Sequence, residues 1–200
     1  MMNWHLRFCL PAAFALLSLS LAGCGSVSGL TRESANAPMR IADFSKVEVL
    51  DFTVSNPRKF EDPKEQAQYD AMLVEAESLF ADKIAEQITA TGAFTEVTRK
   101  AGTDKALRIS GVITRYDEGN IVARGLTGFA GQTHFEANVD VADSGSGKVL
   151  ATLKVDRNSW PLPVGASLST LQTTGFFMNE AAKKIASELV AKRNGSEPKK

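Results

Sequence analysis

The chain has 200 residues, of which 23 are Lys or Arg and 23 are Asp or Glu, so its formal net charge at pH 7 is zero. This balance argues against a nucleic-acid-binding domain and against a surface for anionic lipids, because both need clustered Lys and Arg. With two cysteines and two histidines, the chain also lacks the residues for a disulfide-rich scaffold or a multi-histidine metal centre.

Residues 1–23 have the features of a secretory signal peptide, with Arg7 as the positive start and an apolar core after it. The core is shorter than the ~20 residues of a membrane-spanning helix, so we expect the leader to be cleaved. Residues 21–24, Leu-Ala-Gly-Cys, resemble the lipobox of bacterial lipoproteins. The resemblance implies a diacylglycerol on the thiol of Cys24, cleavage before this residue and acylation of its amine. The alternative is an ordinary signal peptide followed by an incidental cysteine.

Cleavage before Cys24 leaves 177 residues, enough for one domain with its own hydrophobic core. Cys9 lies in the leader, so Cys24 is the one cysteine of the expected mature chain. Once it is acylated, no thiol remains for a disulfide or for catalysis. We expect the acyl chains on Cys24 to hold the protein on a membrane, because several chains together bind stably. Gly25 favours the outer membrane, since Asp at this position resembles an inner-membrane retention signal. The domain is then expected to face the periplasm.

The pattern of the chain divides it into four regions. Residues 1–23 are the lipoprotein signal peptide, and residues 24–43 are the lipidated cysteine with a flexible linker that has no hydrophobic period. As a random coil, this linker spans about 25 Å. Residues 44–195 are predicted to form a single periplasmic domain, and residues 196–200 a disordered tail.

Two segments are predicted to be amphipathic helices. The first has Asp62 as its cap, Pro at the next position and Gly92 as its terminator. The second is predicted to begin at a capping box of Ser169 and Gln172 and to end at Asn194-Gly195.

Strand-like patterns fill most of the remaining domain. They cover residues 44–54, 94–99, 107–116, 134–141 and 149–155, and residues 143–148 between the last two strands have the composition of a hairpin turn. The order strand, helix, four strands, helix predicts the α+β class, with a mixed sheet of about five strands packed by two helices.

Several motifs together resemble a family of bacterial lipoproteins known only as a domain of unknown function. They are the lipobox, Asp51-Phe52 after a Val-rich strand, residues 91–97 (Thr-Gly-Ala-Phe-Thr-Glu-Val), residues 109–116 (Ile-Ser-Gly-Val-Ile-Thr-Arg-Tyr), the glycine-rich residues 124–131 and residues 147–150. In topology that family is distantly similar to the amino-terminal domain of TolB, to the curli-secretion lipoprotein and to lipoprotein activators of penicillin-binding proteins. The resemblance implies binding, assembly or pore formation and supplies no catalytic residues.

The candidate chemical sites are weak. His134 lies on the polar side of its strand without convergent ligands in the sequence pattern, which favours an exposed residue over a zinc ligand. Residues 145–148, Gly-Ser-Gly-Lys, lack the spacing of a phosphate-binding loop and fit a hairpin better. The acidic residues Asp117, Glu118, Asp140 and Asp143 lie at turns and strand ends, where carboxylates are common. We expect no catalytic residue, no metal and no cofactor.

The segment 118–132 is the most distinctive loop, because it combines four glycines with Arg124, Leu126 and Phe129 between two strands. A mobile, partly apolar protrusion of this kind is a good contact element for a partner or for another copy of the chain. The alternative is a folded-back loop in which Phe129 fills a gap in the core. The segment 118–132 is too short for a membrane-spanning hairpin, which needs ~9–11 residues per strand.

From these features we expect an outer-membrane-anchored lipoprotein with a periplasmic binding or assembly domain and no catalysis. Its partners would be the membrane, through the acyl chains on Cys24, and an unidentified envelope protein or a second copy of the chain. The alternatives are a self-assembling structural lipoprotein of the envelope and an envelope hydrolase.

Overall fold

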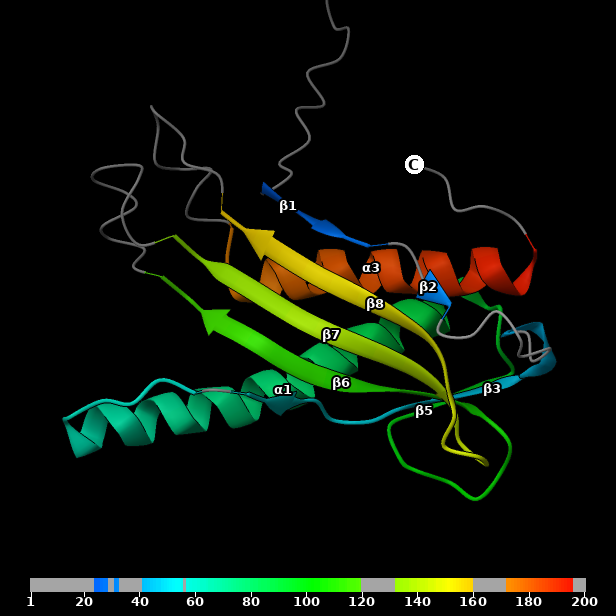
Figure 1. Cartoon of the computed structure of the whole chain (residues 1–200), viewed down its shortest axis with the longest axis horizontal. Helices are drawn as coiled ribbons and strands as arrows, with labels where there is room; N and C mark the ends of the chain where they lie inside the picture. The colour runs from blue at the N-terminus through cyan, green and yellow to red at the C-terminus, as the bar shows by residue number, and fades with distance from the viewer. Residues whose placement is uncertain are drawn as a thin grey trace, which may run out of the picture.

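The computed structural model describes residues 24–28, 31–32, 41–55, 57–119, 132–159 and 172–195. These residues form an open, eight-stranded mixed sheet with two long helices, in the strand order β1-β8-β7-β6-β3-β5 (Figure 1). No helix in this part of the chain has the length and hydropathy needed to cross a membrane. The predicted leader, residues 1–23, and tail, residues 196–200, lie outside the described residues.

The elements follow the predicted order, with three additional short strands. The strands are β1 (Cys24–Val27), β2 (Thr31–Arg32), β3 (Lys46–Val49), β4 (Thr53–Val54), β5 (Glu96–Thr98), β6 (Leu107–Asp117), β7 (His134–Asp143) and β8 (Val149–Asn158). The helices are η1 (Ile41–Asp43), α1 (Pro63–Thr91) and α3 (Thr174–Arg193). Strand β3 is parallel to β5 and β6, whereas β6, β7 and β8 form an antiparallel meander. The α+β class and the mixed sheet are therefore confirmed.

Helix α1 begins and ends where the sequence predicts. The carboxylate of Asp62 accepts a hydrogen bond from the N–H of Lys64, and Pro63 occupies the first helical position. Gly92 ends the helix with φ of 63°, a left-handed conformation that glycine adopts at little cost. The buried side of the helix is formed by Leu73, Ala76, Phe80, Ala81, Ile84 and Ile88. No residue of α1 before Leu73 is buried, and the first turns of the helix extend beyond the sheet in Figure 1.

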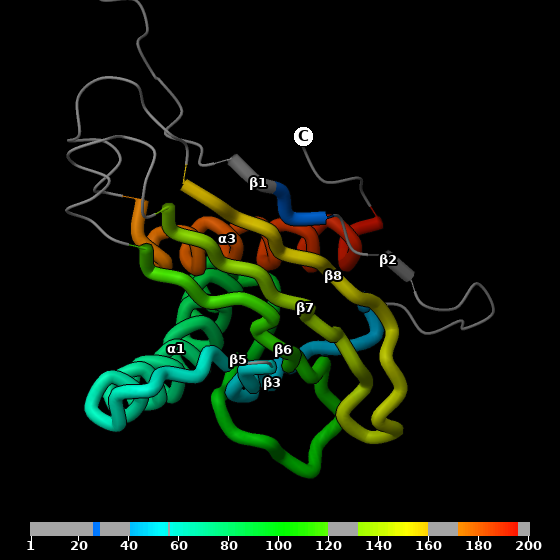
Figure 2. Tube along the Cα trace, turned by 60° about the vertical axis from the view of Figure 1, so that its left-hand side comes forward, coloured from blue at the N-terminus to red at the C-terminus, as the bar shows by residue number. Residues whose placement is uncertain are grey.

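The hydrophobic core lies between one face of the sheet and both helices. Figure 2 shows α1 and α3 on the same side of β6, β7 and β8. Phe80 of α1 packs in its centre, with its ring 4.7 Å from that of Phe52 and 4.9 Å from that of Phe135. Along β7 buried residues alternate with less buried ones, as the period-two pattern of residues 134–141 predicts. The alternate side chains therefore lie on a second face of the sheet, which neither helix covers.

The first predicted strand, residues 44–54, is divided in two. Both pieces, β3 and β4, are parallel to β6, but the backbone N–H of Phe52 between them donates to the carbonyl of Glu77 in α1. The Glu77 carboxylate also accepts a hydrogen bond from the N–H of Val54. Helix α1 thus takes the place of the neighbouring strand at this point and interrupts the ladder.

The predicted linker differs most from the structure. Residues 24–27 form β1, which pairs antiparallel with β8 from Cys24 opposite Asn158 to Val27 opposite Val155. Residues 31–32 form β2 on the same edge of β8. The segment shows no hydrophobic period, because it is held by backbone hydrogen bonds to an existing strand rather than by burial of its own side chains. The start of the described chain is consequently part of the sheet.

The second helix starts later than predicted. Gln172 precedes the helix, and Ser169 lies outside the described residues, so the predicted capping box does not begin α3. The cap is Thr173, whose side-chain oxygen accepts a hydrogen bond from the N–H of Phe176 at 3.2 Å. The predicted end is confirmed, with Asn194 as the C-terminal cap.

Replacing the cap of α3 tests this start. Thr173→Ala removes the acceptor for the Phe176 N–H and should lower the free energy of unfolding by about 1 kcal/mol, or the melting temperature by roughly 2–4 °C. Thr173→Ser keeps the oxygen and should retain most of the stability. Thermal unfolding followed by circular dichroism measures both variants. Equal destabilisation by Ser and Ala would mean that Thr173 does not cap the helix.

Candidate functional site

One end of the sheet brings together side chains that are distant in sequence. The pairing of the strands places Asp117 of β6 opposite His134 of β7, and His134 opposite Asn158 of β8. Asn158 is in turn opposite Cys24 of β1. Since opposite residues lie on the same face, the side chains of Asp117, His134 and Asn158 form a row across three strands, and the backbone of β1 pairs beside it. This end of the sheet also bounds the undescribed segments 120–131 and 160–171.

The next row on this face completes a cluster of three ionisable side chains. Glu136 of β7 lies opposite Asp156 of β8, and both are close to His134. The Nε2 atom of His134 is 2.9 Å from Oε1 of Glu136 and 3.3 Å from Oδ1 of Asp156. We call His134, Glu136 and Asp156 the His134 cluster; all three side chains are partly exposed.

The electrostatics of the cluster are unusual for a sheet surface. Two carboxylates directly opposite each other on neighbouring strands repel, and such a pair is destabilising without a compensating positive charge. The Nε2 atom of His134 carries at most one hydrogen, so it donates at most one hydrogen bond to the two carboxylates. The cluster therefore has more acceptors than the histidine satisfies, and it attracts positive charge.

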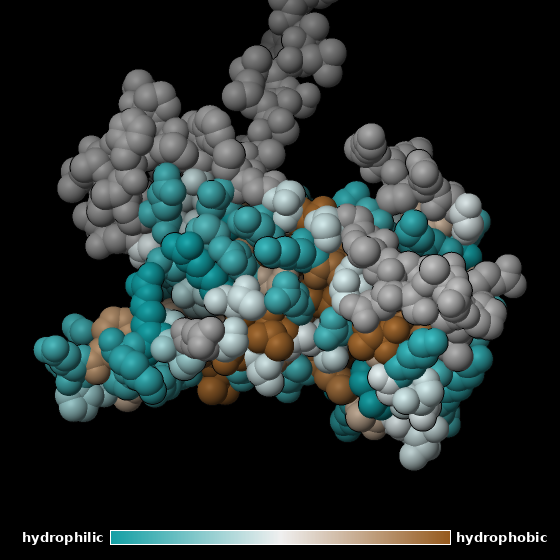
Figure 3. Space-filling model, viewed as in Figure 1, coloured by the Kyte–Doolittle hydropathy of each residue, from teal (hydrophilic) through white to brown (hydrophobic). Residues whose placement is uncertain are grey.

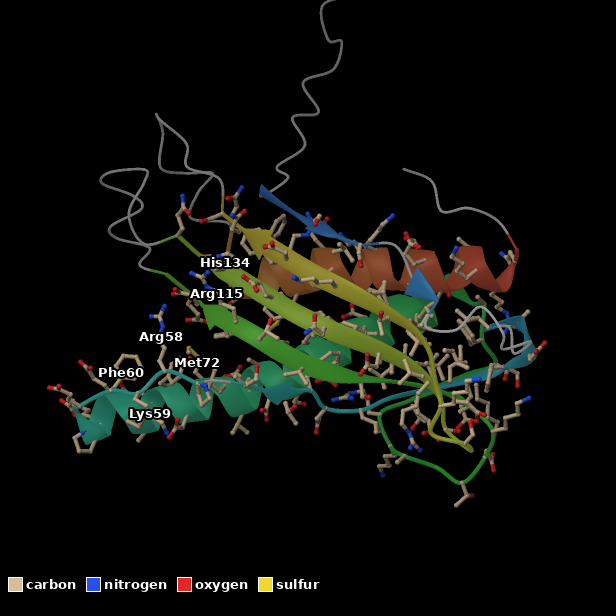
Figure 4. All side chains as sticks on the ribbon, viewed as in Figure 1. Arg58, Lys59, Phe60, Met72, Arg115 and His134 are labelled. Atoms are coloured by element: carbon tan, nitrogen blue, oxygen red, sulfur yellow. The ribbon has the colours of Figure 1, made fainter. Side chains whose placement is uncertain are left out.

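Two arginines lie beside the cluster. Nη1 of Arg115 is 4.0 Å from Oε1 of Glu136, and Nη2 of Arg58 is 2.5 Å from Oδ2 of Asp117. Figure 4 shows His134 and Arg115 at the same end of β6 and β7, with Arg58 beyond Arg115. On the face shown in Figure 3, hydrophilic side chains gather over this end of the strands. The arrangement gives a polar surface with alternating charge, not a single-sign patch.

A buried layer of hydrogen bonds holds this end of the sheet in place. The hydroxyl of Tyr116 donates to Oε1 of Glu118 at 2.9 Å and is 3.1 Å from the hydroxyl of Thr174, the first residue of α3. Burial raises the pKa of Tyr116, so its phenol stays protonated as a donor. Between β7 and β8, Thr133 and Ser159 are tied by hydrogen bonds from the backbone N–H of Thr133 to the hydroxyl of Ser159 and from the N–H of Ser159 to the carbonyl of Thr133. These hydrogen bonds therefore fix the ends of the strands that hold the His134 cluster.

Comparison with known families places the chain in one of them. Residues 47–163, more than half of the chain, match the model of a domain of unknown function, DUF4410. The chain belongs to the DUF4410 family. The prediction of membership in a family of unknown function is therefore confirmed.

Solved structures similar to this DUF4410 chain share little sequence with it. A variant of PelC from Paraburkholderia phytofirmans, solved as a dodecamer, has 15% identity and a TM-score of 0.45, covering 80% of this chain and 96% of that one. A Xanthomonas campestris protein of the family DUF330 has 12% identity and a TM-score of 0.44, covering 80% of this chain and 92% of that one. No curated protein matches the chain in sequence.

The structure of the DUF4410 domain corrects the prediction for His134, but it does not describe the predicted contact residues of the loop 118–132. The prediction that no ligands converge on His134 is wrong, because Glu136 and Asp156 offer oxygens that lie within 4.8 Å of its ring nitrogen and of each other. The sequence carried part of the signal, since residues 134 and 136 share a strand face, but the register that brings Asp156 opposite Glu136 includes a shift between Val141 and Ala142. The predicted contact residues Arg124, Leu126 and Phe129 lie outside the described residues.

The remaining predicted sites behave as structural elements. Residues 145–148 lie at the hairpin between β7 and β8, as predicted, and Gly147 has φ of 68°. Asp143 is a hairpin acceptor whose pKa is lowered by the hydroxyl of Ser146, which donates to it at 2.7 Å. Asp140 lies opposite Thr152 and Ser110 on the open face, away from the His134 cluster.

Proposed function

We propose that this DUF4410 protein is an outer-membrane-anchored lipoprotein that faces the periplasm and acts as a binding or assembly component of an envelope complex. The observation that carries the proposal is the double role of Cys24. It closes the lipobox-like segment 21–24 and is also the first residue of β1, in the sheet. The lipid-bearing residue would then belong to the domain itself.

An acyl anchor on Cys24 would have a defined orientation relative to the sheet. Cys24 lies two strands from His134 in the same row, and adjacent strands are 4.7–4.9 Å apart, so their backbones are separated by about 10 Å. Acyl chains on Cys24 would hold this end of the sheet, with the His134 cluster and Arg115, close to the membrane surface. A 25 Å flexible linker would have allowed any orientation, and β1 removes that freedom.

The open face of the sheet supports a binding role. It presents the polar side chains of three long strands on a rigid frame, which is how precise recognition surfaces are built. Its charges alternate between Arg58, Asp117, Arg115 and Glu136, and this favours a protein partner with complementary charges over a uniformly charged polymer. The near-zero net charge agrees with this preference.

Membrane fractionation tests the anchor, with a matched control in the same chain. The wild-type protein should be found in the outer-membrane fraction and should be released by detergent but not by high salt. Cys24→Ala should lose membrane attachment, whereas Cys9→Ala, which changes the other cysteine, should behave as wild type. A Cys24→Ala protein that stays in the membrane fraction would contradict the acyl anchor.

The mass of the protein in solution separates the binding role from self-assembly. For the Cys24→Ala protein, multi-angle light scattering should give the mass of one chain if the partner is a different envelope protein. A concentration-independent oligomer would instead support the structural, self-assembling lipoprotein and would contradict a heterologous partner as the main function.

A further inference from the structure

We propose that the His134 cluster binds a divalent transition-metal ion, of which Zn²⁺ fits the donors best. This inference does not depend on the lipid anchor, because the cluster is formed by β7 and β8 alone. It rests on two observations: the distances between the ligand atoms and the chemistry of the donors.

The distances already approach those of a tetrahedral zinc site. Nitrogen and oxygen ligands lie at 2.0–2.2 Å from Zn²⁺, so two ligands of one tetrahedral ion are about 3.3 Å apart. Nε2 of His134 is 2.9 Å from Oε1 of Glu136 and 3.3 Å from Oδ1 of Asp156. All three ligand atoms lie within 4.8 Å of one another, so small side-chain rotations bring them around one ion.

The donor set selects the kind of metal. Imidazole nitrogen suits zinc, copper, iron and nickel, whereas magnesium and calcium prefer a full shell of oxygens. One neutral imidazole with two carboxylates carries a charge of −2, which the Arg115 guanidinium, 4.0 Å from Glu136, offsets only in part and a divalent ion offsets directly. Binding requires the lone pair of Nε2, so His134 must carry its single proton on Nδ1, and any proton on Nε2 is released to solvent. The metal therefore relieves the repulsion between Glu136 and Asp156.

Asn158 lies in the same row as His134 and has a side-chain oxygen without a hydrogen-bond donor among the described residues. It lies directly opposite His134 and two residues from Asp156, on the same side of β8. Its Oδ1 atom is buried, and a water molecule bound to the metal in the fourth position would be a donor for it.

Titration with zinc tests the proposal on the protein as cells produce it, purified in mild detergent and stripped with a chelator. Calorimetry with ZnCl₂ should show one saturable site, and Zn²⁺ should raise the melting temperature. CaCl₂ and MgCl₂ at the same concentration should show no saturable site and should not raise the melting temperature. Cobalt(II) should give the intense visible absorption of a four-coordinate ion.

The variants are chosen to separate ligands from neighbours. His134→Ala, Glu136→Gln and Asp156→Asn should each weaken zinc binding at least tenfold. Asp140→Asn removes a carboxylate of the same strand and face outside the cluster and should leave binding unchanged. Asp156→Asn keeps the size of the side chain and guards against loss of binding through misfolding, which thermal unfolding checks. No saturable site in the wild type, or equal binding in the wild type and in His134→Ala and Asp156→Asn, would overturn the proposal.

Discussion

Gly111→Ala is expected to be among the most destabilising single-methyl additions in the domain. Gly111 lies in β6, opposite Val139 of β7. A Cβ atom at this position would lie 2.0 Å from the backbone oxygen of Asn138 and 2.8 Å from the ring of Phe52. The first contact is with backbone, which has no rotamer to change, and Phe52 is fully buried against Phe80.

The expected size follows from overpacking. Forcing the strands apart should cost about 3 kcal/mol, which for a domain of this length lowers the melting temperature by roughly 10 °C. Gly175→Ala is the matched control, because its Cβ would meet only the hydroxyl of Thr173 at 3.8 Å near the start of α3. That variant should be as stable as wild type or slightly more stable. A loss below 1 kcal/mol for Gly111→Ala would contradict the close approach of β6 and β7.

The second large effect is expected at Arg108, which neutralises a buried carboxylate. Glu48 of β3 is 2% exposed, and its Oε2 accepts hydrogen bonds from Nε and Nη2 of Arg108 at 3.1 and 2.9 Å. Its other oxygen accepts from the backbone N–H of Gly102 at 2.8 Å. Arg108→Met keeps an unbranched apolar stem but removes the guanidinium, and leaves the carboxylate with this single donor. Denaturant unfolding should show a loss of about 3 kcal/mol.

Two further variants test whether the loss of stability comes from the ion pair of Arg108 with Glu48. Arg115→Met changes the same residue type on the same strand, but that side chain is half exposed and 4.0 Å from Glu136, so the loss should stay below about 0.5 kcal/mol. The double variant Glu48→Gln with Arg108→Met removes the buried charge and should recover part of the stability. Equal losses for Arg108→Met and Arg115→Met would show that the burial of Glu48 does not matter.

The sequence predicts the elements whose signals are local. The cap at Asp62 and the terminator at Gly92 fix α1, and the alternation from His134 to Val141 fixes the faces of β7, because helix caps and strand periods depend on neighbouring residues only. Strand β1 has no such signal. Its place is decided by the free edge of β8, more than a hundred residues later, and its Gly and Ser residues give no pattern of their own.

The candidate site was only partly predictable for a related reason. His134 and Glu136 on one strand face follow from alternation, but their meeting with Asp156 depends on the exact register of the hairpin between β7 and β8. That register shifts between Val141 and Ala142, where an irregularity interrupts the ladder. Without this irregularity, counting residues across the turn would place the neighbour of Asp156 opposite Glu136. That neighbour lies on the other face of the sheet.

The mass of the intact protein isolated from membranes is the most direct test of the central claim that Cys24 is a lipid anchor built into the sheet. The expected result is the mass of residues 24–200 increased by a diacylglycerol and one further acyl chain, with all added mass on the peptide that begins at Cys24. A mature protein that begins elsewhere, or that begins at Cys24 without added mass, would contradict the anchor and leave an unlipidated DUF4410 domain.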